Sequence, residues 1–245
     1  MTGSPFVHEP LFWLGPAPVT EAVALTWAIM GLMVGGLAPL TRRLSLKPSR
    51  RQAVLELVVS TIDAQIRETM QTEPGPYRAL IGTIFLYILL ANWTSLIPGI
   101  DPPTAVVETD AALALIVLLA SVYFGVRTRG IAGYLGTFAE PAWVMIPLNI
   151  VEQITRTFSM FVRLFGNIMS GVFIIGIVLS LAGLLVPIPL MALDLITGTV
   201  QAYIFTVLAM VFIGAAVGGE HKQSSGPPDA NSPGMNPSDM NRSAP

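Results

Sequence analysis

The chain has 245 residues and a net charge of −2, and 53% of its residues are hydrophobic whereas only 11% are charged. Soluble domains carry about 25% charged residues, so this composition argues against a soluble enzyme and indicates an integral membrane protein. Cysteine is absent and the two histidines, His8 and His221, lie outside the apolar segments, so we expect no metal site and no cofactor.

The N-terminal segment, residues 1–21, is expected on the outer face of the membrane. Its first 20 residues contain no lysine or arginine, so it lacks the positive region of a cleavable signal peptide. Residues 22–40 are apolar or small and are long enough to cross a core of about 30 Å. A basic cluster follows, which the positive-inside rule places in the cytoplasm; a lipid-headgroup or nucleic-acid patch is the alternative. The cluster contains Arg42, Arg43, Lys47, Arg50 and Arg51.

Residues 53–72 predict an amphipathic helix that lies in the membrane plane on the cytoplasmic side. Apolar residues recur at helical spacing, while Glu56, Asp63 and Arg67 mark the opposite face and make the segment too charged to span. A helix packed on a partner subunit is a compatible alternative. Two prolines and a glycine in residues 73–76 then end the helix.

Residues 79–97 and 111–126 predict a two-span hairpin. The loop between them is acidic, so it is expected on the outer side, and the arginines after the second span return the chain to the cytoplasm. The acidic residues are Asp101, Glu108 and Asp110, and the arginines are Arg127 and Arg129. Asn92 is either a polar residue satisfied between helices or, with Ser95, part of the lining of an aqueous cavity.

The last two apolar runs, residues 148–186 and 190–217, are separated by a proline-containing turn. The first run would be about 58 Å long as a straight helix, against a membrane core of about 30 Å. We therefore expect it to be steeply tilted or broken. Near its start Glu152 and Arg156 are four residues apart, so they could form an ion pair; a role of Glu152 in ion passage is an alternative of equal weight.

Residues 161–171 read FVRLFGNIMSG and place one arginine, Arg163, in this apolar run. A charge within a membrane span costs about 2.5 to 3.5 kcal/mol on insertion scales, and a guanidinium stays protonated, so this residue needs a reason. The alternative is an arginine that snorkels to the interface. Asn167, four residues further on, shares its helix face, and Gly166 and Gly171 allow another helix to approach closely.

Two polar residues on the last apolar run, Asp194 and Gln201, are seven residues apart and share a helix face. By position alone, Asp194 is either a helix-end residue at the membrane interface or a functional carboxylate within the membrane.

The string RLFGN around Arg163, with Glu152 eleven residues before it and Gln201 on the next helix, closely resembles subunit a of the rotary F-type ATP synthases. The resemblance covers about residues 8–218 in layout and residues 147–212 in close motif detail. It implies that the two long helices form a nearly horizontal hairpin. We therefore expect an all-α membrane protein with one upright N-terminal span, an in-plane amphipathic helix, a two-span hairpin and a hairpin of two steeply tilted helices, five crossings in all.

The same resemblance implies a stator subunit that couples proton or sodium translocation to rotation of the c-ring, and so to ATP synthesis or ATP-driven pumping. Two aqueous half-channels would be separated by Arg163, whose guanidinium Gln201 and Asn167 would hold in place. The implied partners are c-ring rotor subunits, b-type peripheral stalk subunits and the remainder of the synthase. The candidate ion-translocation residues are Arg163, Gln201, Asn167, Asp194, Glu152 and Asn92.

The chain departs from the family at two positions. Relatives can carry an acidic residue where this chain has Ser95, and an ionisable pair on the two long helices is reduced here to Asp194, because its first member reads as Val172. One carboxylate is therefore expected where some relatives have two ionisable groups.

The last segment, residues 219–245, is rich in Pro, Ser, Asn and Gly and is expected to be a disordered cytoplasmic tail. Residues 22–218 form the predicted membrane domain, in a bacterial inner membrane and in contact with lipid. The chain has no GxxxxGK[ST] phosphate loop and no basic surface interleaved with aromatics, so we expect neither ATP hydrolysis by the chain itself nor nucleic-acid binding. The alternative function is a channel or secondary transporter subunit with its own substrate site.

Overall fold

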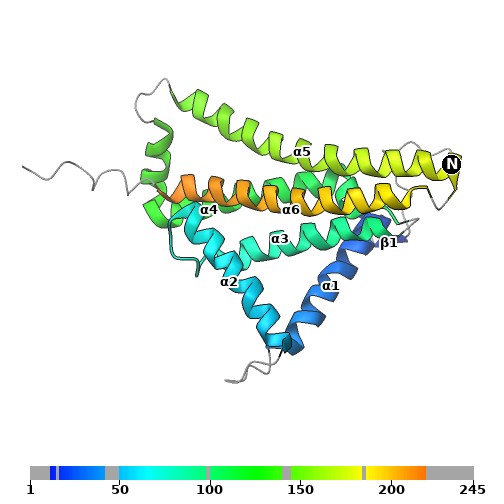
Figure 1. The fold of residues 1–245 in the computed structure, drawn as a ribbon. Coiled ribbons are helices and arrows are strands. Elements are labelled where there is room, and N and C mark those ends of the chain that lie inside the picture. The colour runs from blue at the N-terminus through cyan, green and yellow to red at the C-terminus, as the bar shows by residue number, and fades with distance from the viewer. Residues whose placement is uncertain are drawn as a thin grey trace, which may run out of the picture.

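The computed structural model describes residues 12–14, 17–41, 50–97, 100–139, 145–183 and 186–218 (Figure 1). Within them the regular structure is helical apart from an antiparallel pair of three-residue strands near the N-terminus, so the predicted all-α class is confirmed. The predicted tail, residues 219–245, and the basic cluster up to Lys47 lie outside the described residues. The elements are β1 (Phe12–Leu14), β2 (Ala17–Val19), α1 (Glu21–Thr41), α2 (Arg50–Met70), α3 (Arg78–Trp93), η1 (Thr94–Leu96), η2 (Pro103–Ala105), α4 (Val107–Ala139), α5 (Met145–Ala182) and α6 (Ile188–Val217).

Four helical stretches in the described part are long and apolar enough to cross a membrane, which makes this a multi-pass membrane protein. They are Arg78–Leu96, Val107–Gly136, Ile146–Ala182 and Ile188–Val217. A shorter apolar stretch, Glu21–Gly36, lies in α1. Five crossings, with α1 as the first of them, stay a prediction.

Helix α6 occupies the centre of the structure and packs against α2, α3, α4 and α5. Its buried face supplies Ala202, Phe205 and Ala209 to the larger core cluster, which α3 and α4 complete. Helix α5 adds to this cluster a stripe at four-residue spacing, formed by Met160, Leu164 and Ile168, as expected for one face of a helix.

Helix α2 runs obliquely to α3 and α6, as Figure 1 shows, and an ion pair fixes it to the start of α3. Arg78 donates from Nε and Nη2 to the two carboxylate oxygens of Asp63, both at 2.5 Å. Asp63 is only 9% exposed, although the sequence pattern placed it on the outward polar face of this helix. The bidentate partner on the next helix allows the carboxylate to be buried.

The helix that contains the third predicted span is longer than residues 111–126, because α4 continues to Ala139. It changes direction at Gly130, whose φ of 74° lies in the left-handed region that glycine adopts at little cost. In Figure 1 the segment after this bend turns across the ends of α5 and α6. Gly130 is therefore a kink within one long helix.

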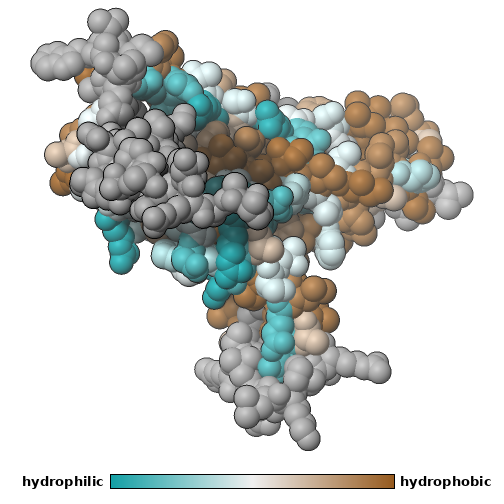
Figure 2. Space-filling model, turned by 60° about the vertical axis from the view of Figure 1, so that its left-hand side comes forward, coloured by the Kyte–Doolittle hydropathy of each residue, from teal (hydrophilic) through white to brown (hydrophobic). Residues whose placement is uncertain are grey.

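The outer surface of the helical body is largely apolar. Figure 2, turned to bring the end of α4 and α6 forward, shows hydrophilic residues gathered beside the grey part and a broad hydrophobic surface beyond them. Most of the large exposed side chains on α5 are aliphatic or aromatic, such as Ile154, Phe158 and Ile177. This surface suits contact with lipid tails or with other apolar helices.

Candidate functional site

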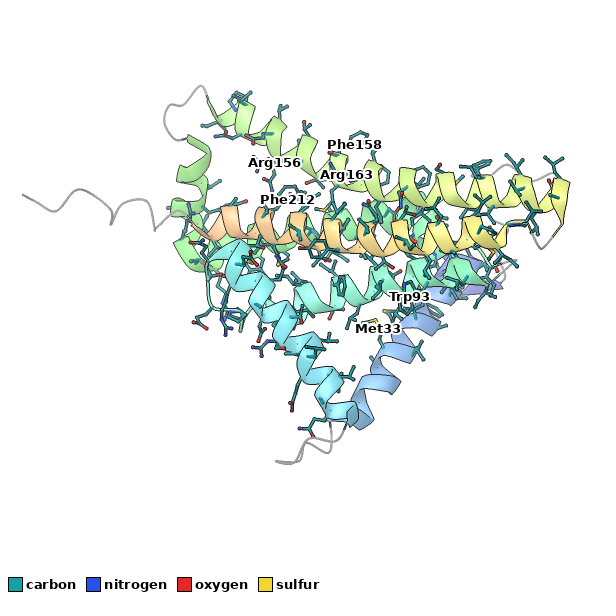
Figure 3. The ribbon with its side chains drawn as sticks, in the orientation of Figure 1. Met33, Trp93, Arg156, Phe158, Arg163 and Phe212 are labelled. Atoms are coloured by element: carbon teal, nitrogen blue, oxygen red, sulfur yellow. The ribbon has the colours of Figure 1, made fainter. Side chains whose placement is uncertain are left out.

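The two long helices, α5 and α6, run antiparallel and define the site. Gly171 of α5 lies against the carboxylate of Asp194 on α6, and the guanidinium carbon of Arg156 lies 5.9 Å from the centroid of the Phe212 ring. Figure 3 shows Arg156 reaching from α5 toward Phe212. Between these two contacts the register places Arg163 at the level of residues 202–205 on α6.

Arg163 stands at the edge of the contact between α5 and α6. It lies seven residues after Arg156 and therefore shares its helix face, but its side chain is exposed. Arg163 makes no hydrogen bond or ion pair with any residue that the structure describes. A permanent charge at mid-helix, with no compensating group among the described residues, favours a partner on another subunit.

Gln201 and Asn167, the two amides expected to hold Arg163, lie near its level along the helices, but they are turned toward the interior. Gln201 is 6% exposed and forms no hydrogen bond with a described residue. The Nδ2 atom of Asn167 is buried and also has no partner. The expected hydrogen bonds to the guanidinium are therefore not formed in this structure. Gln201 and the amide nitrogen of Asn167 are buried, whereas the Arg163 side chain is exposed.

A polar layer joins α3, η2 and α6. Asn92 is 2% exposed and donates from Nδ2 to the carbonyl oxygen of Gly198 at 2.8 Å, and it accepts at Oδ1 from the Thr104 hydroxyl at 2.8 Å. Trp93, labelled in Figure 3, donates from Nε1 to Thr199 Oγ1 at 3.2 Å. A Cβ atom on residue 198 would lie 3.0 Å from the Asn92 Cβ, so glycine permits this approach.

Asn92 is thus satisfied between helices, as the structural alternative predicted. The same side chain also lies beside the carboxylate region, because Ser95, one turn further along, donates its hydroxyl to Asp194 Oδ2 at 3.0 Å. Asp194 is 8% exposed and lies inside the helix bundle rather than at a helix end. Its neighbours are a hydroxyl and the backbone of Gly171, so it is a carboxylate held in the interior without a positive charge.

Glu152 lies away from this layer, near the start of α5. Its carboxylate forms an ion pair with Arg156, and both side chains are about half exposed. Of the two interpretations that the sequence favoured equally, the structure contains the pairing. Such an exposed pair contributes little to stability, so it does not explain by itself why both charges are present in an apolar helix.

Sequence reasoning missed two residues of the polar layer, Thr104 and Asp110. Both are 0% exposed, although Asp110 was assigned to an acidic outer loop. It belongs to the first turn of α4, and both of its carboxylate oxygens are buried without a partner among the described residues. The signal was present in the spacing, because Asp110 shares a helix face with Leu113 and Val117, which belong to the core.

Comparison with known proteins agrees with the geometry. The family model described as ATP synthase A chain matches residues 23–214. The chain is 53% identical over 218 residues to ATP synthase subunit a 2 of Bradyrhizobium sp. (strain BTAi1), covering 89% of this chain and 98% of that protein. It is 44% identical over 214 residues to ATP synthase subunit a of Albidiferax ferrireducens, covering 86% and 93%. It is 46% identical over 220 residues to ATP synthase subunit a 1 of Chlorobaculum parvum, covering 89% and 97%. These matches span most of both chains, so this protein belongs to the ATP synthase A chain family.

Proposed function

We propose that this chain is the ion-translocating stator subunit of an F-type ATP synthase and that Arg163 separates two half-channels within it. The observation that carries the proposal is an exposed Arg163, without a partner among the described residues, at the edge of a buried two-helix interface. The family membership supports it, since the relatives are named ATP synthase subunit a. By itself the subunit has no catalytic role.

The outer half-channel would use the polar layer on the side of α6 where that helix begins. Asp194 and Ser95 offer a carboxylate and a hydroxyl, and Asn92 continues the polar groups toward Gly198. A carboxylate in this position attracts a cation or accepts a proton, and hydroxyl groups extend a path for it. An ion entering here passes from the level of Asp194 toward that of Arg163.

The rotor would present membrane-embedded carboxylates to the open edge of α5. When one of them approaches Arg163, the guanidinium favours its ionised form, because opposite charges attract strongly where water is scarce. The carboxylate then releases its ion on one side and takes up another on the other side. Arg163 also repels free cations, so ions cannot leak between the half-channels.

The inner half-channel would open near Glu152 and Arg156, toward the cytoplasm. The chain would lie in a bacterial inner membrane with its N-terminus outside and its C-terminus inside, as the basic segments favour. The c-ring, b-type stalk subunits and the remaining synthase subunits would be its partners. One charge crossing 100 mV is worth about 2.3 kcal/mol, so several ions must pass for each ATP.

Purification of the tagged chain from its native membrane tests the proposal. We expect a ring of small hairpin subunits and a nucleotide-hydrolysing head to copurify with it, and the reconstituted complex to accumulate protons or sodium ions when ATP is added. A channel or transporter subunit would instead purify without the ring and head. Ion movement that needs neither ATP nor the ring would contradict the proposal.

A further inference from the structure

Asp110 is a buried acid that the half-channel described above does not use. Its side chain is 0% exposed, and both carboxylate oxygens lack a hydrogen-bond partner among the described residues. The ion pairs formed by the described residues join Arg78 to Asp63 and Arg156 to Glu152, so none includes it. Burial of a carboxylate without a partner is costly, and structural carboxylates are normally satisfied.

Contacts between α4 and α6 give the depth of Asp110. The two helices run parallel: Arg129 donates to the carbonyl oxygen of Val217, and a Cβ atom on Gly125 would lie 3.3 Å from the Cβ of Ala216. The same offset places Asp110 beside residues 198–201 of α6. This level lies between Asp194 and the level of Arg163, at residues 202–205.

Polar side chains from α3, η2 and α5 lie at this level. Asn92 of α3 and Thr104 of η2 are hydrogen-bonded to each other there. Asn167 of α5 carries a buried amide nitrogen without a partner at about the same depth, since it follows Arg163 by one turn.

We propose that Asp110 is a second cation-relaying carboxylate of the outer half-channel, located between Asp194 and Arg163. The inference rests on the proposed function. The transported cation, a proton or a sodium ion, binds the Asp110 carboxylate after leaving Asp194 and neutralises it. Its release toward the rotor carboxylate returns Asp110 to the ionised form, so each passage leaves the residue unchanged.

This assignment explains why an acid without a fixed partner lies among apolar core residues. A purely structural carboxylate would gain from a permanent donor, whereas a relay must exchange its partner in every cycle.

The test compares variants of the whole complex in sealed vesicles, with proton and sodium uptake each measured after addition of ATP. Asp110→Asn keeps the shape but cannot bind a cation by charge, and we expect it to lower the uptake rate per assembled complex by about tenfold or more. Asp101→Asn, at an exposed acid of the same outer region, is the matched control and should transport at the unmodified rate. Uptake by Asp110→Asn at the unmodified rate would overturn the inference.

A second pair covers the case in which Asp110→Asn assembles poorly. Asp110→Glu keeps the charge, while Asp110→Gln has a side chain of the same length as glutamate but no charge. Asp110→Glu should therefore transport faster than Asp110→Gln per assembled complex. Equal rates for this pair would also overturn the inference. Arg163→Ala in the same vesicles distinguishes failure of the relay from failure of the proposed function. Ion uptake by Arg163→Ala would contradict the proposed function. If Arg163→Ala blocks uptake while Asp110→Asn takes up ions at the unmodified rate, only the relay is contradicted.

Discussion

Helices α5 and α6 are similar in length and both strongly apolar, yet they are buried to very different extents. In the most apolar stretch of α6, 44% of the residues are buried within the chain, compared with 11% for α5. Helix α6 has neighbours from α2 to α5, while α5 buries one stripe and leaves its other sides open. Composition does not distinguish the two helices, but packing does.

The functional side chains follow this difference. Asp194 and Gln201 are buried on α6, whereas Arg163 is exposed on α5. On the same side of α5, Ile174 and Ile177 are 50% and 55% exposed. Apolar side chains can face lipid, but a guanidinium at mid-helix is stable there only beside a polar or acidic partner. We infer that the Arg163 side of α5 belongs to an interface with another subunit.

The largest effect is expected from the charge on the open helix. Arg163→Ala should abolish ATP-driven ion uptake, because no other described side chain places a fixed positive charge at this level. Arg163→Lys should also fail, since an ammonium lacks the planar guanidinium and can lose its proton in a dry site. Arg156→Ala is the matched control on the same face, and its exposed ion pair predicts a much smaller loss. Equal losses for Arg163→Ala and Arg156→Ala would remove the special role of Arg163.

The buried carboxylate on α6 comes next in the size of its effect. Asp194→Asn should slow ion uptake strongly, by about tenfold, because the amide keeps the shape and loses the charge. It should not stop uptake completely, since the barrier residue is intact. Thr197→Val provides a control on an exposed neighbour whose hydroxyl bonds only to the backbone of its own helix. Unchanged uptake by Asp194→Asn would contradict this prediction and leave Asp194 with a structural role only.

A smaller effect is expected at the glycine that faces this carboxylate. Any side chain at residue 171 overlaps with Asp194, so Gly171→Ala should shift the carboxylate and reduce uptake several-fold. Gly176→Ala on the same helix has open space around it and should transport normally. The comparison can be read from initial uptake rates at equal amounts of assembled complex. Normal transport by both variants would mean that the close approach is not required.

The smallest effect on transport is expected from apolar substitutions on α5. Their effect on stability should differ clearly between the buried side and the exposed side of this helix. Ile168→Ala removes a side chain that is 1% exposed and should lower the free energy of unfolding by about 2 kcal/mol. Ile174→Ala, at a side chain that is 50% exposed, should change it by less than about 0.5 kcal/mol in the isolated subunit. Denaturant unfolding in mixed micelles measures both. Similar losses would show that α5 is covered on both sides by its own chain.

Much of the fold follows from apolar run lengths, and the choice of Arg163 follows from the cost of an intramembrane charge. The course of α4 past Arg129 was not predictable, because a glycine that bends a helix and one that ends it look alike in sequence. Burial of Asp63 depends on Arg78, a partner fifteen residues away that no local pattern specifies.

The candidate site was predicted in its residues more than in its contacts. Spacing along one helix brought Arg163 and Asn167 near each other, but it did not show that Gln201 faces inward while Arg163 stays at the open edge. Asp110 was missed because a charged residue beside a loop resembles a surface acid. Its spacing from Leu113 and Val117 on α4 was the signal that could have placed it on the buried face.

Cross-linking tests most directly the claim that the Arg163 side of α5 faces the rotor. Ser159 and Ser170 are exposed on this side, and the chain has no cysteine, so Ser159→Cys and Ser170→Cys introduce single thiols with little change in size. In the complete complex, we expect both to form disulfides with a cysteine placed beside the rotor carboxylate. Ser121→Cys, which is buried and faces Gln153, should not. Absence of cross-links from both α5 positions in an assembled, active complex would contradict the account.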